Sequence, residues 1–358
     1  MDFFRSPLTR LSLSFSLIAT FFISTAVMSP DRGTAQDDKA NKLKSTPVSS
    51  VTTVAAGFEL NGKKMLDAEL LFPFQQKLYE IDFYGYSLRR DVYRDSLYKN
   101  HVFALAKKAG KTSLEVDSEL LSVSKPSEKE LKEMYESLPA QGAAYPFEAI
   151  KEHLQREIMD RKRMAKKQTL IDQLVKQEKF KLLLKEPVPP KAQINTHGAP
   201  SKGAQKGKVT LVKFSDFYCG QCRAMSTTLT KIMKMKEFSK HVSVVYMPYT
   251  LFGDKSVQIV KEAYCAGKQN KFWEFHDKAF AVSSLSQELG QKFAQELSLD
   301  LKAFDTCMKD KETENFVMAT KQEGEMLGVE GTPSLFVNGV KLLSIHEEDI
   351  KKAMKKHL

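Results

Sequence analysis

Two of the four cysteines have the spacing of a redox-active pair. Cys219 and Cys222 are separated by two residues and follow an apolar run at 209–214. The residues after them are compatible with a helix, so Cys219 should lie at a helix N-terminus. Unpaired backbone N–H groups and the helix dipole favour a negative sulfur there. We expect Cys219 to attack as a thiolate and Cys222 to resolve the mixed disulfide that forms.

A Cys-x-x-Cys pair can instead be half of a structural zinc site. Zinc would need two further ligands, usually a second such pair or two spaced histidines. The other cysteines, Cys265 and Cys307, stand alone, and the seven histidines form no such pair. We therefore expect no metal and no cofactor at this site.

The elements that must position the pair follow from the pattern of apolar residues. The runs at 209–214 and 242–246 predict buried strands, and the pattern from about 254 to 321 is helical. An Asn-Gly step within 333–345 is typical of a β-hairpin. A last helix is expected at 347–356. This order of elements predicts an α/β fold with a helical insertion.

Four segments in this part of the chain carry a family resemblance. They are FSDFYCGQC, CAGKQNKFWEFHDKAF, FDTCMKD and GVEGTPSLFVNG, and they resemble the DsbA-like thioredoxin family from about residue 190 to the end. The resemblance implies a thioredoxin fold and thiol–disulfide exchange. It also implies that Pro333 follows a cis peptide bond and that Thr332 pairs its backbone with a bound peptide. By the same pattern Cys265 and Cys307 should form a structural disulfide.

The two residues between the cysteines depart from the family's strongest oxidants, which have Pro-His there. Gly220 and Gln221 supply no cation, and Gln221 can donate only a neutral hydrogen bond. The thiolate should then be less stabilised and the disulfide less oxidising, unless Arg223 folds back toward it. The direction of exchange, oxidase against isomerase or reductase, stays open.

The first 35 residues predict export. Arg5 and Arg10 precede an uncharged run at 11–28, and small residues follow it up to residue 35. This order is typical of a secretory signal, although the run is also long enough to remain as an anchor. The rest of the chain would be periplasmic or otherwise extracytoplasmic, and membrane-anchored if the leader is not cleaved. Residues 36–56 are interpreted as a linker.

A separate all-α domain is expected at 57–186, joined by a linker at 187–207 to a thioredoxin-like domain at 208–358. An apolar stripe in the 148–176 segment and a capping box at Ser127 predict two of its helices. In order and spacing the region resembles the N-terminal helical domain of SurA-type chaperones, through features that include ELNGK at 59–63. That resemblance implies apolar faces that could hold unfolded clients or join copies of the chain into a homo-oligomer.

The composition of the chain limits the classes of binding partner that we expect. The chain is 42% apolar and 28% charged, as in soluble globular proteins. Its net charge of +11 comes from scattered lysines without interleaved aromatic residues, so we expect no nucleic-acid partner. The expected substrates are secreted proteins that are folding, with a membrane partner resetting the dithiol. The alternative is a periplasmic holdase in which the redox pair is secondary.

Overall fold

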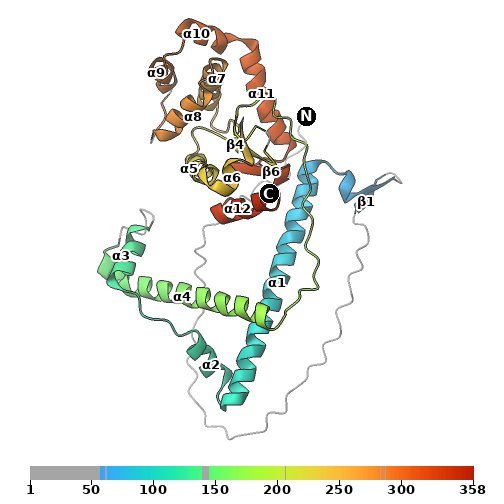
Figure 1. The fold of residues 1–358 in the computed structure, drawn as a ribbon, viewed down its shortest axis with the longest axis vertical. Helices are drawn as coiled ribbons and strands as arrows, with labels where there is room; N and C mark the ends of the chain where they lie inside the picture. Colours follow the sequence, from blue (N-terminus) through green and yellow to red (C-terminus); the bar gives the residue numbers. More distant parts are fainter. Residues whose placement is uncertain (1–56, 61–62, 139–144, 206, 283, 287) are drawn as a thin grey trace, which may run out of the picture. The chain divides into compact units, whose positions relative to one another are not determined.

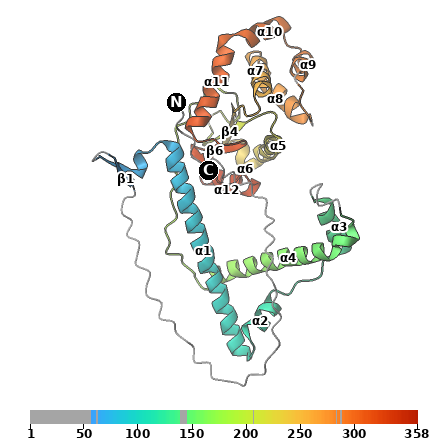
Figure 2. The same cartoon turned by 180° about the vertical axis from the view of Figure 1, so that it is seen from behind.

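The computed structural model describes residues 57–60, 63–138, 145–205, 207–282, 284–286 and 288–358. The expected leader and the linker at 36–56 lie outside the described residues. Figures 1 and 2 show the described helices and strands from opposite sides.

The amino-terminal region opens with a short antiparallel hairpin rather than a helix. Strand β1 (Gly57–Leu60) pairs with β2 (Lys63–Leu66), and the short 3-10 helix η1 (Asp67–Glu69) follows. The sequence pattern had suggested helices alone in this region. Asn61-Gly62, a dipeptide typical of two-residue hairpin connections, separates the two strands in the sequence and accounts for the difference.

Four helices form the rest of this region. They are α1 (Phe72–Ala109), α2 (Ser113–Leu120), α3 (Glu128–Glu136) and α4 (Phe147–Gln177). Helix α1 packs against α2 and α4, and α3 packs against α4. The expected capping box joins Ser127 to Glu130, and a second joins Thr112 to Glu115. A small apolar core holds α1, α2 and α4 together, made by Tyr98, Val102, Ala106, Val116, Ile171 and Leu174.

A five-stranded mixed sheet organises the carboxyl-terminal region. Its strands are β3 (Ser201–Gly203), β4 (Val209–Ser215), β5 (Val242–Pro248), β6 (Ser334–Val337) and β7 (Val340–Lys341), in the spatial order β3-β5-β4-β6-β7. Strands β4 and β5 are parallel, and the other pairs are antiparallel. Both central strands are almost continuously buried because both faces of the sheet are covered.

Helices α5 (Gly220–Lys234), α6 (Lys236–Ser239) and α12 (Glu347–Lys355) cover one face of the sheet. The other face packs against residues that follow α11 (Lys311–Met326), including Leu327 and Val329. The expected hairpin is present, with Asn338 and Gly339 at positive φ in its turn, although β7 is only two residues long. This arrangement is the thioredoxin fold that the sequence predicted.

The helical insertion lies between β5 and β6. It comprises α7 (Asp254–Lys268), α8 (Phe272–Ala281), α9 (Leu289–Glu296), α10 (Leu301–Lys309) and α11, which ends at Met326 rather than near residue 321. In both views α7 to α10 form a group at one end of the sheet. A largely aromatic core fills this group and extends to the cysteine motif.

The segment expected to be a linker at 187–207 contains one short strand and some apolar contacts with the sheet. It contains β3, which pairs with the edge of β5. Three of its small apolar side chains, Ala192, Ile194 and Ala199, pack against the sheet. The open edge of β5 offers backbone partners that composition alone does not reveal.

Candidate active site

Cys219 occupies the N-cap position of helix α5, as its sequence position predicted. Its Sγ accepts a hydrogen bond from the backbone N–H of Cys222 at 3.2 Å. Gly220 is the first residue of the helix, so Cys222 lies within the first turn. A sulfur that caps a helix in this way meets the partial positive charge of the helix N-terminus.

Residues near the end of the chain complete the site. The Thr332–Pro333 peptide bond is cis, and the Cys219 thiol donates to the Thr332 carbonyl oxygen over 3.3 Å. The pairing of Ser334 on β6 with Phe214 on β4 brings this loop to the end of the strand that leads into the motif. The structure thus places Thr332 and Pro333 beside the dithiol, where the family resemblance expected them.

The two sulfurs have different environments. Cys219 is 8% exposed, whereas Cys222 is fully buried. A hydrogen bond from the Cys222 thiol, together with hydrogen bonds from the Thr332 side chain and from the backbone N–H groups of Cys222 and Gln221, lowers the pKa of Cys219 to about 6 against the opposing effect of burial. Burial raises the pKa of Cys222 well above its ordinary value. The pair therefore contains one sulfur that ionises near neutral pH and one that stays protonated.

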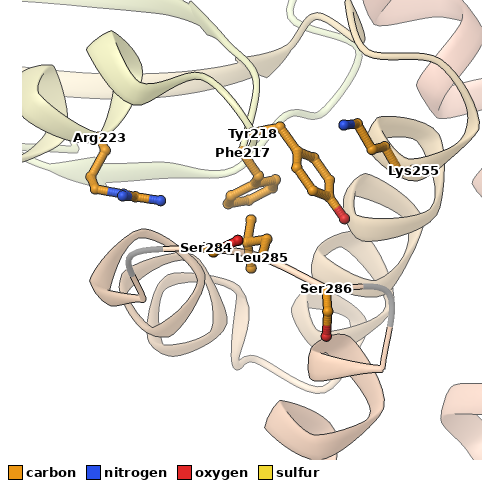
Figure 3. A pocket seen from close by; sticks show the side chains of 7 residues that line it. All are labelled: Phe217, Tyr218, Arg223, Lys255, Ser284, Leu285 and Ser286. Atoms are coloured by element: carbon orange, nitrogen blue, oxygen red, sulfur yellow. The ribbon is translucent and has the colours of Figure 1, made fainter.

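The residues between and after the cysteines lie at the surface of the site. Gly220 and Gln221 are exposed, and a backbone hydrogen bond from Gln221 contributes to lowering the pKa of Cys219. The side chain of Arg223 is directed into a neighbouring pocket (Figure 3).

This pocket has a volume of about 360 Å³ and mixes aromatic, basic and hydroxyl groups. Lys255 Nζ lies 4.8 Å from the centre of the Tyr218 ring, which precedes Cys219 directly in the chain. The residues that line it are Phe217, Tyr218, Arg223, Lys255, Ser284, Leu285 and Ser286 (Figure 3).

A buried aspartate fixes the loop that carries the motif. Asp216 is fully buried, and its two carboxylate oxygens accept the backbone N–H groups of Tyr218 and Leu251. It therefore ties the approach to Cys219 to the loop that follows β5. The sequence analysis did not single out this residue, although a carboxylate three residues before a cysteine at the end of an apolar strand was a signal.

A buried lysine also escaped the sequence analysis. Lys213 is 2% exposed and points from β4 toward α5, where its Nζ donates to the carbonyl oxygen of Cys222 at 3.2 Å. Burial lowers the pKa of Lys213 to about 8. The available signal was a single charged residue inside the apolar run Val209–Ser215. Such residues are almost never fully buried without a partner.

Cys265 and Cys307 form a disulfide between α7 and α10, 42 residues apart in sequence. In the same helical insertion, on α8, His276 lies in a cage of aromatic rings and is hydrogen-bonded to Asp277 at 2.7 Å. Burial lowers the pKa of His276 to about 4. The disulfide lies within the insertion, and His276 is neutral at physiological pH.

The structure adds two general observations. Across the part of the chain that it describes, no group of three or more His, Cys, Asp or Glu side chains is arranged to hold a metal ion. Among the helices built from those residues, none combines the length and the apolar character needed to cross a bilayer.

Comparison with known proteins agrees with this geometry. The thioredoxin family model matches residues 195–356. The "probable disulfide bond formation protein D" of Bacillus anthracis is 27% identical over 169 residues, which are 44% of this chain and 77% of that protein. The Na(+)/H(+) antiporter NhaA 1 of Salinispora arenicola is 31% identical over 147 residues, which are 38% of this chain but only 21% of the antiporter.

A solved structure is similar over a comparable share of this chain. BdbD from Bacillus subtilis, in its oxidised form, has a TM-score of 0.42 and 19% sequence identity, and the match covers 47% of this chain and 97% of BdbD. The carboxyl-terminal part of the chain is a thioredoxin-like domain. Its relatives include proteins named as disulfide bond formation proteins.

Proposed function

We propose that this chain is an exported thiol:disulfide oxidoreductase that exchanges disulfides with folding proteins through Cys219 and Cys222. One observation carries the proposal. The Sγ of Cys219 caps α5 and lies 3.3 Å from the carbonyl oxygen of Thr332, the residue before the cis-proline. Disulfide exchange requires an attacking thiolate, which the sulfur of Cys219 can supply. The protonated second sulfur can resolve the mixed disulfide, and the facing backbone group can hold a peptide.

The different sulfur environments support separate roles. Because the pKa of Cys219 is lowered to about 6, this sulfur is largely a thiolate at neutral pH and can attack a substrate disulfide. The buried Cys222 thiol, one helical turn away, is then placed to attack the mixed disulfide and release the substrate. A peptide bound across the site would pair with the backbone of Thr332.

The expected partners are folding proteins outside the cytosol and a membrane redox protein that resets the dithiol. Export through the leader at 1–35 is part of this proposal. The mixed aromatic and basic pocket beside Tyr218 supports contact with peptide residues that flank the substrate cysteine. A reduction potential close to that of thioredoxin, about −270 mV, would favour the reductase direction over the oxidase direction.

Substitution of each cysteine tests the proposal. Cys219→Ser should reduce insulin reduction and the oxidative refolding of a reduced client to the uncatalysed rate. Cys222→Ser should instead accumulate a mixed disulfide between Cys219 and the client. On a non-reducing gel this species gives a separate band, which is lost when the sample is first treated with a reductant. Exchange at the wild-type rate by Cys219→Ser would refute the assignment.

A holdase is the second candidate, and one observation favours it. Helix α1 exposes an unusual number of large apolar side chains, including Phe74, Ile81, Tyr84, Leu88, Val92, Tyr93 and Phe103. Large exposed apolar patches mark surfaces that bind other proteins. Such a surface could bind unfolded clients or a second copy of the chain through 57–186.

The two candidate functions can be separated with one variant. If the helical region acts as a holdase, Cys219→Ser should suppress the aggregation of a denatured client as well as the wild-type chain does, measured by light scattering. Sedimentation at several protein concentrations would show whether copies associate. Absence of both client protection and association would exclude this role for α1.

A further inference from the structure

A positive charge lies behind the dithiol although none stands between the two cysteines in sequence. Lys213 is at the centre of β4 and only 2% exposed. Its Nζ donates to the carbonyl oxygen of Cys222 and to the hydroxyl of Ser226, both on α5. Both acceptors are neutral, so these hydrogen bonds hold the ammonium in place without balancing its charge.

The rest of the environment of Lys213 is mostly aromatic. Its Nζ lies 4.8 Å from the centre of the Phe280 ring and 5.8 Å from that of Tyr246. The ionisable groups that face it come from four elements, and they are Cys219 and Cys222 at the start of α5, Tyr246 on β5, Lys202 on β3, and His276 and Asp277 on α8.

The surrounding groups leave the sulfurs as the main source of compensating charge. The Asp277 carboxylate is hydrogen-bonded to His276. Among the described residues, no carboxylate forms an ion pair with Lys213, whereas a negative charge on Cys222 or Cys219 and the carboxylate of Asp277 favour its protonated form. Of the two sulfurs Cys219 carries the charge, because burial raises the pKa of Cys222. Lys202 opposes that form, and its Nζ lies 4.3 Å from the centre of the Trp273 ring.

We infer that Lys213 is the counter-charge of the Cys219 thiolate and that it makes the Cys219–Cys222 disulfide a stronger oxidant than Gly220 and Gln221 alone would. This inference rests on the proposed function and specifies its direction. A buried ammonium is destabilised because water is removed from it. A nearby thiolate offsets that cost in the reduced protein, whereas the uncharged disulfide cannot. The reduced dithiol is thereby favoured.

The reaction balances in electrons and protons. Two client thiols lose two electrons and two protons and become a disulfide, while the bond between the two sulfurs of the site breaks. Near neutral pH one proton goes to the Cys222 sulfur and the other to solvent, and Cys219 leaves as the thiolate. In the reduced chain Lys213 is largely protonated at pH 7, because its pKa is about 8. It therefore acts by charge and position rather than by accepting the proton.

Lys213→Met tests the inference in the full chain. The equilibrium constant with reduced and oxidised glutathione at pH 7 should shift about tenfold toward the protein disulfide, which corresponds to about 30 mV for a two-electron couple. The pKa of Cys219, followed by its alkylation rate, should rise. Lys231→Met, the same change at an exposed lysine of α5, is the matched control and should stay within about twofold of wild type. A Lys213→Met constant equal to that of the control would overturn the inference.

A second measurement does not depend on the variant folding. In the wild-type chain, the number of protons taken up on reduction should exceed one in a pH range that ends near pH 8, and it should return to one above about pH 9. This follows because the disulfide form loses the Lys213 proton at lower pH than the thiolate form does. Lys213→Arg, which stays charged, should keep the wild-type equilibrium constant at pH 7 and lose the extra proton. Uptake of one proton throughout in the wild type would contradict the inference.

These measurements are independent of the proposed function. The glutathione equilibrium reports on the dithiol whether or not proteins are its substrates. Failure of exchange with insulin or a refolding client would refute the function, whereas an unchanged equilibrium constant in Lys213→Met would refute only the role of Lys213.

Discussion

The two regions of this chain use apolar residues in opposite ways. In the carboxyl-terminal domain, the large side chains of the sheet are buried from water, and Phe214, Leu335 and Phe336 are 0% exposed. In the helical region a small core holds the helices, while many large apolar side chains of α1 remain exposed. The first arrangement holds a reactive pair in one geometry. The second leaves a surface that another protein could cover.

The comparison can be tested first through the disulfide, which belongs to the carboxyl-terminal domain. Replacing both Cys265 and Cys307 with alanine should lower the free energy of unfolding of this domain by about 4 kcal/mol, because a 42-residue separation is no longer closed in the unfolded chain. The fluorescence of Trp273, the single tryptophan, would report this domain alone during urea unfolding. An unchanged midpoint would mean that the insertion does not depend on its covalent link.

A core substitution should have the next largest effect. Leu335→Ala removes a fully buried side chain from the centre of the sheet core and should destabilise the domain by about 3 kcal/mol, since the cavity would be only partly filled. The same urea titration measures it. A loss below about 1 kcal/mol would show that this core is less tightly packed than its burial indicates.

The pH dependence of the dithiol should be smaller but specific. Because the pKa of Cys219 is lowered to about 6, its alkylation by iodoacetamide should fall about tenfold for each pH unit below that value, with Cys222 unreactive. The folded pKa lies below that of the unfolded chain, so the thiolate stabilises the reduced protein above the unfolded value. That stability is lost as the pH falls through about 6. Reduced Cys219→Ala, titrated in parallel, should lack this change.

The smallest effect is expected on α1. Leu88 is 51% exposed, and Leu88→Ala should change the free energy of unfolding by less than about 0.5 kcal/mol, followed by far-ultraviolet circular dichroism. If α1 binds clients or a second copy, the same variant should weaken that binding. A loss of stability comparable to that of Leu335→Ala would mean that this face is part of a core and would remove the contrast between the regions.

Local features of the chain could be predicted from sequence because their causes act over a few residues. The helix N-terminus at Cys219, the capping box at Ser127 and the Asn338-Gly339 turn each depend on neighbours within one turn of the backbone. The strands expected at 209–214 and 242–246 followed from their apolar character, and the structure extends them to Ser215 and Pro248. With the family resemblance, this was enough to anticipate the fold class and to expect Thr332 and Pro333 beside Cys219, whose role in exchange stays a prediction.

The remaining features depend on which distant segments pack together. Thr332 contacts Cys219 although the two are 113 residues apart in the sequence. Strand β3 lies in a segment whose composition is typical of a linker, and it pairs with the edge of β5. Whether a lysine in an apolar strand is buried behind the dithiol or reaches solvent depends on the helix that covers that face. The amino-acid sequence alone therefore determined the Cys219–Cys222 pair and the helix that begins there. Tertiary packing determined that the Lys213 side chain lies behind this pair, because electrostatic partners depend on distance in space rather than along the chain.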